Sequence, residues 1–318
     1  MKTFAVGIDI GGTNTILGFV DKEGNIFHEK IFKTRSYQSA DDLISDLSSY
    51  IKQIQFSGDS NLIGIGVGAP NGNFYNGTIE YAPNLNWEGV IDVVKLFNNY
   101  IDTKVLLTND ANAAAIGEKI FGDAKDCNDF IVITLGTGVG SGFFIDGKLL
   151  YGHTGFAGEF GHTIAIPDGR LCGCNRKGCL ETYTSARGVV KTFLEIAKNE
   201  TYPSKLLYLP ENRLNSELIY KAATEGDEIA LKAFDYTAKV LGEKLGDAVA
   251  ITSPERIYLF GGLARSGDLL LKPLKKYFED SLLEIFKNKV DIRISGLLNK
   301  NAAVLGASSL IWDIYSEK

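Results

Sequence analysis

The sequence has few cysteines and histidines and no long apolar run. Only four cysteines and three histidines occur in its 318 residues. No apolar stretch is long and unbroken enough to cross a bilayer as a helix, and the N-terminus lacks the pattern of a signal peptide. We therefore expect a cytoplasmic protein with no membrane partner. In that reducing compartment, clustered cysteines more often bind a metal than form disulfides.

The chain also has no surplus of positive charge. Its 33 lysines and arginines against 39 aspartates and glutamates leave a formal net charge of −6, with a pI of about 5.3. General binding to nucleic acid or to an anionic membrane relies on a basic surface, so this balance argues against both. Hydrophobic residues make up 45% and charged residues 23%. Such a composition is normal for a globular protein of one large domain or two ordinary ones.

Glycine is abundant, with 35 residues, and several of these glycines directly follow apolar, strand-like segments. A unit of apolar strand, glycine loop, second strand and turn occurs twice, at 4–27 and 130–151. This weak repeat predicts two related α/β halves, each beginning with a meander whose first hairpin loop is made of glycine. Helices are expected at 41–54 and 301–315, and the segment 71–87, rich in Asn, Gly and Pro, is expected to be a loop.

Three glycine loops follow strands, at 11–14, 137–142 and 261–262. A loop without side chains lets backbone N–H groups approach a phosphate closely. A P-loop is excluded, because the GxxxxGK at 142–148 is followed by Leu149 where Ser or Thr must bind Mg²⁺. No GxGxxG lies between a strand and a helix, which excludes the dinucleotide fingerprint. Any single loop could serve only as a tight turn, whereas three together favour phosphate binding.

The chain contains, in this order, the motifs GIDIGGTNTILGFV, NDANAAAIGE, TLGTGVGSGFFIDGKLL, AGEFGH and CGCNRKGCLE. In this combination and at these distances they resemble the ROK family of repressors, open reading frames and kinases, which includes bacterial glucokinases. The resemblance runs from about residue 4 to the final helix. It implies an actin/hexokinase-like (ribonuclease H-like) duplicated fold, with two α/β domains and a cleft between them. The smaller domain is expected at 1–116 plus a C-terminal helix at about 301–318, and the larger at 117–300 with a zinc-binding loop.

The resemblance also implies roles for single residues. ATP with Mg²⁺ would lie across the glycine loops, in contact with Asp9, Gly11, Gly12, Thr13, Asn14, Thr137, Gly138, Gly261 and Gly262. Asp110 matches the family's catalytic aspartate, which takes the proton of the sugar hydroxyl while Mg²⁺ and backbone dipoles carry the phosphate charge. From the residues alone, Asn109 or Asp110 could simply cap the helix that starts there, and that helix N-terminus favours an ionised Asp110.

Six residues match the family's hexose contacts: Asn84, Asn109, Asp110, Glu159, His162 and Glu181. Acceptors and amides of this kind suit sugar hydroxyls, each of which is both a donor and an acceptor. Taken singly, Asn84 could be a turn residue and Glu181 a helix-start carboxylate. The Glu at 159 matches the family's glucokinases, whereas its N-acetylmannosamine kinases tend to differ at that position.

Three of the four cysteines lie within eight residues, and a histidine precedes them. His162, Cys172, Cys174 and Cys179 are ligands of the kind that tetrahedral zinc prefers. A disulfide with one thiol left over, or a cluster of reduced thiols, are the alternatives. The cluster matches the family's zinc site except at Asn175, which replaces a glycine and tolerates a left-handed backbone better than most residues. On the family pattern this zinc is structural, and His162 turns its second ring nitrogen to the sugar.

The resulting prediction is an ATP-dependent hexose kinase that converts glucose to glucose 6-phosphate. Fructose, mannose, N-acetylglucosamine and allose stay open as substrates, and polyphosphate stays open as a donor. A sugar-responsive repressor is disfavoured, because the helix-turn-helix of such proteins precedes the kinase-like body and the first strand here begins by residue 4. A sugar sensor without catalysis is the third alternative. The resemblance also implies a homodimer or a higher homo-oligomer.

Overall fold

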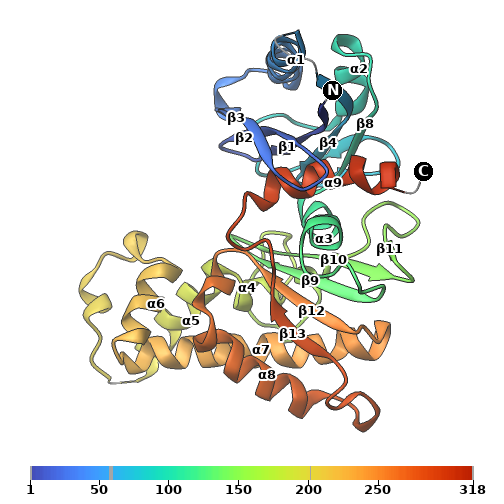
Figure 1. Ribbon diagram of the computed structural model, residues 1–318. Coiled ribbons are helices and arrows are strands. Elements are labelled where there is room, and N and C mark those ends of the chain that lie inside the picture. The colour runs from blue at the N-terminus through green and yellow to red at the C-terminus, as the bar shows by residue number, and fades with distance from the viewer. Residues whose placement is uncertain (1, 57–59, 201, 317–318) are drawn as a thin grey trace. The chain divides into compact units, whose positions relative to one another are not determined.

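The computed structural model describes the whole chain except residues 1, 57–59, 201 and 317–318 (Figure 1). Groups of strands alternate with groups of helices along the chain, as expected for an α/β protein. Within the described residues, every helix is too short or too polar to cross a membrane.

The described chain divides into two compact units, and each is described by itself. The first unit comprises Met1–Asn128, Gly142–Gly158 and Ser295–Lys318, and the second comprises Asp129–Ser141 and Glu159–Ile294. The first unit thus extends past residue 116, where the sequence-based boundary was placed. It also contains the C-terminal helix that was expected at about 301–318, and residues 317–318 of that range lie outside the described residues.

The first unit is built on a five-stranded sheet in the order β3-β2-β1-β4-β8. Its strands are β1 (Lys2–Ile10), β2 (Thr15–Val20), β3 (Ile26–Phe32), β4 (Ser60–Ala69) and β8 (Val105–Asn109). The first three form an antiparallel meander, whereas β1, β4 and β8 run parallel. β1 and β4 are buried on both faces, which explains why their sequences are almost continuously apolar. The carboxyl ends of the parallel strands meet at one edge, where open α/β sheets bind their ligands.

Helices cover both faces of this sheet, with α1 and α2 on one side and α9 on the other (Figure 1). The helices of the unit are α1 (Ala40–Phe56), α2 (Val93–Tyr100), α3 (Asp110–Phe121) and α9 (Ala302–Ser316). α9 lies directly on the strands because two glycines leave it room. A Cβ on Gly7 would lie 2.0 Å from the Val304 carbonyl oxygen, and one on Gly66 would lie 1.9 Å from that of Ala307. Any side chain at either position would push this helix off the sheet.

The segment expected to be a loop at 71–87 contains two short strands, so that prediction was wrong for residues 72–73 and 78–80 and holds for the turns around them. β5 (Gly72–Asn73), β6 (Thr78–Glu80) and β7 (Val90–Asp92) form a small antiparallel sheet. The Asn73 side-chain oxygen accepts hydrogen bonds from the backbone N–H groups of Tyr75 and Asn76 and turns the chain between β5 and β6. The turn-forming residues therefore connect a tight hairpin rather than an irregular loop.

The second unit contains the parallel strands β9 (Phe130–Leu135), β12 (Arg256–Phe260) and β13 (Asp291–Ile294). The sheet to which they belong has the order β11-β10-β9-β12-β13, with β10 at Val139–Ile145 and β11 at Lys148–Leu149. The helices are α4 (Glu181–Thr184), α5 (Ala186–Asn199), α6 (Ser216–Thr224), α7 (Glu228–Thr252) and α8 (Asp268–Ser281). The long α7 packs against α5, α6 and α8 (Figure 1).

Candidate active site and metal centre

Two carboxylates lie close together at the carboxyl edge of the first unit's parallel strands. Asp9 is the penultimate residue of β1, and Asp110 begins α3 directly after β8. Gly68 of β4 lies between them. A Cβ on that glycine would lie 3.9 Å from the Asp9 Oδ1 and 3.9 Å from the Asp110 Cα. Burial raises the pKa of Asp9 to about 7, and the Asp110 charge also raises it.

At the start of α3, the helix cap and the candidate general base are two different, neighbouring residues. Asn109 is the N-cap, and its Oδ1 accepts a hydrogen bond of 2.8 Å from the Ala111 N–H. The Asp110 Oδ1 accepts from the same N–H, also at 2.8 Å. The helix start lowers the pKa of Asp110 as expected, but desolvation by the surrounding protein raises that pKa more, even though the side chain has exposed surface. Because a raised pKa favours proton uptake, this carboxylate suits the task of a general base.

The first glycine loop, residues 11–14, connects β1 to β2 beside these carboxylates. The Gly11 N–H donates to the Asn14 carbonyl oxygen at 3.0 Å and closes the turn. Asn84 packs on this loop, since a Cβ on Gly12 would lie 2.2 Å from the Asn84 carbonyl oxygen. The structure thus places one predicted sugar residue against the predicted phosphate loop.

In the second unit, the glycine residues at 137–138 and 261–262 follow the neighbouring parallel strands β9 and β12. The loop expected at 137–142 is shorter than predicted, because residues 139–142 belong to strand β10. Gly261 has a φ of 103°, and a Cβ there would lie 2.6 Å from the Leu135 carbonyl oxygen, so only glycine fits. Glu181 lies against the loop after β9. Its Oε2 accepts a hydrogen bond of 3.0 Å from the Val139 N–H, and a Cβ on Gly138 would lie 2.4 Å from the same oxygen. This carboxylate therefore touches a predicted nucleotide loop, a contact that the sequence did not indicate.

The three cysteines and the histidine of the predicted metal site come together in the same unit. The ligand atoms of His162, Cys172, Cys174 and Cys179 all lie within 4.8 Å of one another. The Cys174 and Cys179 sulfurs are 3.6 Å apart, and the Cys172 Sγ is 3.7 Å from the His162 Nδ1. Ligands about 2.3 Å from a tetrahedral zinc lie roughly 3.8 Å from one another, so the set fits zinc. Cys172, Cys174 and Cys179 form no disulfide with one another, which disfavours the disulfide alternative.

The loop that carries these ligands is shaped by its backbone. The Cys172 N–H donates to the Arg176 carbonyl oxygen at 2.8 Å, which turns the chain back toward Cys179. Asn175 has a φ of 65°, so it adopts the left-handed conformation for which asparagine was expected to be suited. Gly178 has a φ of 81°, and a Cβ there would lie 1.8 Å from the Ile166 carbonyl oxygen.

The His162 ring connects the thiols to a carboxylate. Its Nδ1 faces Cys172, whereas its Nε2 lies 3.9 Å from the Oε2 of Glu159. Glu159 directly precedes the short 3₁₀ helix Phe160–His162. One ring nitrogen is thus available to a metal, and the other faces the side on which Glu159 lies.

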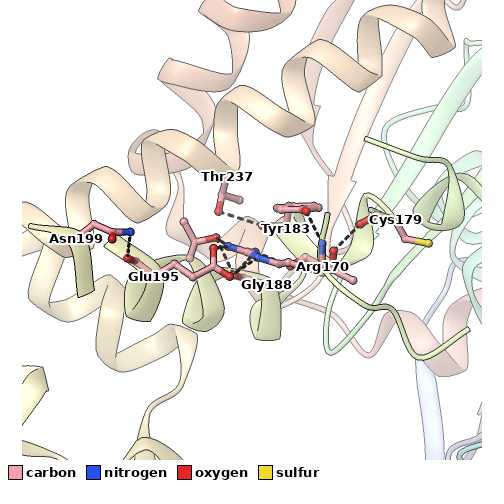
Figure 2. A network of polar contacts seen from close by, with 9 residues as sticks. Arg170, Cys179, Tyr183, Gly188, Glu195, Asn199 and Thr237 are labelled. Carbon is pink, nitrogen blue, oxygen red and sulfur yellow. Dashed lines mark hydrogen bonds and ion pairs between the residues drawn. The ribbon is translucent and has the colours of Figure 1, made fainter. Parts of the chain in front are cut away.

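Arg170 holds this loop to two helices, and sequence reasoning missed it (Figure 2). Its Nε and Nη2 donate to the Glu195 carboxylate at 2.9 and 2.6 Å, and its Nη1 donates to the Thr182 carbonyl oxygen at 2.7 Å. Nη2 also donates to the Thr192 hydroxyl at 2.9 Å, and the guanidinium lies 4.4 Å from the Tyr183 ring centroid. No local signal could have shown this, because an arginine in a polar turn usually lies in solvent.

The predicted site residues therefore gather in groups within each unit. The first unit brings together Asp9, Gly11, Gly12, Thr13, Asn14, Asn84, Asn109 and Asp110. The second brings Glu159 and His162 to the cysteines, and Glu181 to Gly138, with Thr137 in the same loop and Gly261 and Gly262 in the neighbouring one.

Comparison with known proteins agrees with the sequence motifs. The model of the ROK family matches residues 5–314. The glucokinase of Halalkalibacterium halodurans is 35% identical, over 96% of this chain and 94% of that protein. A xylose repressor of Caldicellulosiruptor bescii is 28% identical, over 96% of this chain and 77% of the repressor. The crystal structure of a ROK family glucokinase from Streptomyces griseus, in complex with glucose and AMPPNP, is 31% identical, with a TM-score of 0.80 over 96% of this chain and 98% of that chain. The expected family and its actin/hexokinase-like fold are thus confirmed, and the chain belongs to the ROK family.

Proposed function

We propose that this protein is a glucokinase, which transfers the terminal phosphoryl group of ATP to the 6-hydroxyl of glucose. The observation that carries the proposal is the pair of neighbouring carboxylates, Asp9 and Asp110, beside a glycine loop at the carboxyl edge of a parallel sheet. The similarity to glucokinases at 31–35% identity supports the same reaction. The Streptomyces griseus structure, with glucose and an ATP analogue, supports both substrates.

Asp110 is the general base in this reaction. Its carboxylate accepts the proton of the sugar hydroxyl as that oxygen forms a bond to the terminal phosphorus of ATP. The bond from this phosphorus to the bridging oxygen breaks, and ADP leaves with the electron pair. Asn109 and Asn84, with amide donors and acceptors, orient the sugar hydroxyls.

The glycine loops hold the nucleotide through their backbone N–H groups. Residues 11–14 bind the phosphates, together with Thr137 and Gly138, and the loop at 261–262 binds the adenosine end. Asp9 fits a bound Mg²⁺ because a carboxylate with a raised pKa gains from a neighbouring cation. When bound, Mg²⁺ neutralises phosphate charge.

The sugar is recognised by Glu159, His162 and Glu181. His162 and the three cysteines would hold a zinc ion, which would support this loop and would leave the transfer to the other residues, because four protein ligands would complete its coordination. His162 keeps its ring fixed through Nδ1 and presents Nε2, beside Glu159, to a sugar hydroxyl. Glu181 contacts the second glycine loop as well, so its position affects sugar and nucleotide together.

A coupled assay of ADP release across a panel of hexoses tests the proposal. Glucose should give the highest kcat/KM against fructose, mannose, N-acetylglucosamine and allose, with ATP preferred over polyphosphate as the donor. A higher kcat/KM for another hexose would support the proposed kinase activity but show that glucose is not the preferred substrate. Absence of turnover with every hexose would overturn the proposed activity.

A sugar-responsive regulator is the second candidate, favoured by the similarity to the xylose repressor. It predicts that the protein binds glucose or xylose in calorimetry without phosphorylating either. The expected cytoplasmic location and the homodimer or higher homo-oligomer stay predictions. Light scattering of the purified protein measures its oligomeric state.

A further inference from the structure

Two cationic side chains lie on the first glycine loop, immediately after β3. The Lys33 Nζ donates to the Asn14 Oδ1 at 2.9 Å, and the Arg35 Nε donates to the Gly12 carbonyl oxygen at 3.3 Å. Both side chains are exposed. Within the described chain, neither forms an ion pair with a carboxylate, and the Arg35 Nη groups donate to no acceptor. Two positive charges with unused donors therefore border the loop.

The backbone fixes the position of these cations. Thr34, which lies between them, is fully buried, and its hydroxyl is 2.9 Å from that of Thr15. Its N–H donates to the Thr13 carbonyl oxygen at 3.0 Å. Because Thr34 is held in the interior, its neighbours Lys33 and Arg35 point toward solvent and reach the glycine loop. Their location beside Gly12 and Asn14 thus follows from the packing of the chain rather than from chance side-chain conformations.

The loop itself has free hydrogen-bond donors. In the part of the chain that the structure describes, the backbone N–H groups of Gly12, Thr13 and Asn14 have no protein acceptor, whereas that of Gly11 is used within the turn. Successive N–H groups of this kind form a concave site for an anion. The carboxylates of Asp9 and Asp110 lie at the same edge and repel an incoming phosphate. Nearby positive charge is therefore needed to balance them.

We infer that Lys33 and Arg35 form an anion subsite that binds the terminal phosphoryl group of the nucleotide beside the loop 11–14. The inference rests on the proposed function, in which this loop holds the ATP phosphates. Lys33 acts as a point charge, and Arg35 offers the planar Nη pair that suits two oxygens of one phosphate. Because negative charge spreads over the phosphoryl oxygens during transfer, both cations also stabilise the transition state.

Calorimetry with inorganic tripolyphosphate, ATP, ADP and glucose 6-phosphate, each in the absence of the other ligands, tests the subsite. The double variant Lys33→Ala/Arg35→Ala should bind tripolyphosphate and ATP about 10- to 100-fold more weakly, since charged hydrogen bonds are lost. ADP, which lacks the terminal group, should weaken by less than about 3-fold. Lys30→Ala is the matched control, because this exposed cation on β3 lies over the rings of Phe32 and Tyr50 instead of the loop. It should leave every affinity within about 2-fold of wild type.

Two further variants separate anion binding from support of the loop. Arg35→Gln keeps an amide that can donate to the Gly12 carbonyl oxygen but removes the charge, whereas Arg35→Lys keeps the charge. An anion subsite predicts that the lysine variant retains most of the ATP affinity and that the glutamine variant loses it. Rescue by glutamine would show a supporting role only and would overturn the inference.

The remaining outcomes are also decisive. Wild-type affinity of the double variant for tripolyphosphate and ATP would overturn the subsite, whatever the enzyme's activity. A loss confined to glucose 6-phosphate would assign the cations to the product and contradict the inference as well. If the wild type phosphorylates no hexose, the proposed function fails, yet tripolyphosphate binding still decides whether the cations form an anion site.

Discussion

The cysteine loop (residues 162–181) and the first glycine loop (11–14) use their polar groups in opposite ways. In the cysteine loop, the Arg170 guanidinium donates to a carboxylate, a carbonyl and a hydroxyl of the same unit, and backbone hydrogen bonds close the turns. In the glycine loop, three backbone N–H groups and two neighbouring cations have donors that no acceptor among the described residues uses. A loop whose donors are satisfied internally acts as a support, whereas a loop with unused donors binds a ligand.

The two regions also differ in their ionisable groups. Close carboxylates with raised pKa values border the glycine loop, which is what proton transfer requires. The cysteine loop instead brings together four soft or borderline groups, the ligand set that we propose for a structural metal. Substitutions in the first region should therefore change the rate and the pH dependence of stability. Substitutions in the second should change stability, metal content and sugar affinity.

The largest effect is expected from Asp110→Asn, which keeps the shape of the side chain and removes the proton acceptor. kcat should fall by at least about 10²-fold while glucose binding by calorimetry stays largely unchanged. Asp92→Asn is the matched control, because Asp92 caps α2 by accepting from the Lys95 N–H and asparagine caps as well. Near wild-type turnover of Asp110→Asn would mean that Asp110 is not the general base and only begins the helix. The two regions would then no longer differ in catalytic role.

Cys174→Ser tests the supporting role of the cysteine loop. Wild-type protein should contain about one zinc per chain by elemental analysis, and the variant should lose it. The glucose Kd should rise by roughly 10- to 100-fold as Glu159 and His162 lose their alignment. Because Glu181 contacts Val139, the ATP Kd should rise too, but by less.

Cys127→Ser is the control for this loss, because Cys127 is buried outside the cluster and its variant should keep the zinc. Equal weakening of glucose and ATP binding by Cys174→Ser would mean that the metal supports the whole unit. If the wild-type protein contains no zinc and the variant binds glucose and ATP as the wild type does, the proposed metal site is contradicted.

Glu159→Gln tests whether the region around the cysteine loop binds the sugar directly or only supports the fold. One charged acceptor becomes a mixed donor and acceptor, so KM for glucose should rise by about 10- to 100-fold, with a smaller change in kcat. Steady-state kinetics measures both parameters. An unchanged KM would remove Glu159 from the sugar site and leave the loop with a structural role alone.

Arg170→Met keeps the apolar stem of this side chain and removes the guanidinium. The melting temperature should fall by several degrees, because the carbonyl of Thr182 and the hydroxyl of Thr192 lose their donor. Zinc affinity, measured by competition with a chelator, should fall by about 10-fold. Arg293→Met is the control, since its pair with Asp291 is half exposed and should contribute little. An equal change in both variants would contradict a specific role of Arg170 in the loop.

The sequence predicted the elements and the site motifs better than the contacts between them. Apolar spacing predicted the helix at 41–54, found as α1, because periodicity reports which face is buried. The final helix expected at 301–315 is found as α9, which is buried on all sides over residues 304–312. The small sheet between 72 and 92 was missed, because asparagine and glycine mark a hairpin turn and a loop alike. The partners of Arg170 lie 12 to 25 residues further along the chain, and nothing in the local sequence indicates them.

The smallest effect among these predictions is a change in melting temperature caused by Asp9→Asn, and the size of this change depends on pH. The folded-state pKa of Asp9, about 7, lies above its unfolded value, so the fold favours the protonated acid. The stability that this carboxyl contributes is therefore complete below about pH 4 and is lost as the pH rises through 7. The asparagine variant carries no charge, so without Mg²⁺ or ATP its melting temperature should exceed that of wild type by about a few degrees at pH 8 and by less at pH 5. Arg170→Met, on the other loop, should lower the melting temperature by the same amount at both pH values. An Asp9→Asn difference that does not change with pH would mean that Asp9 ionises normally, and Asp110 would then be the one carboxyl beside the glycine loop for which a raised pKa is expected.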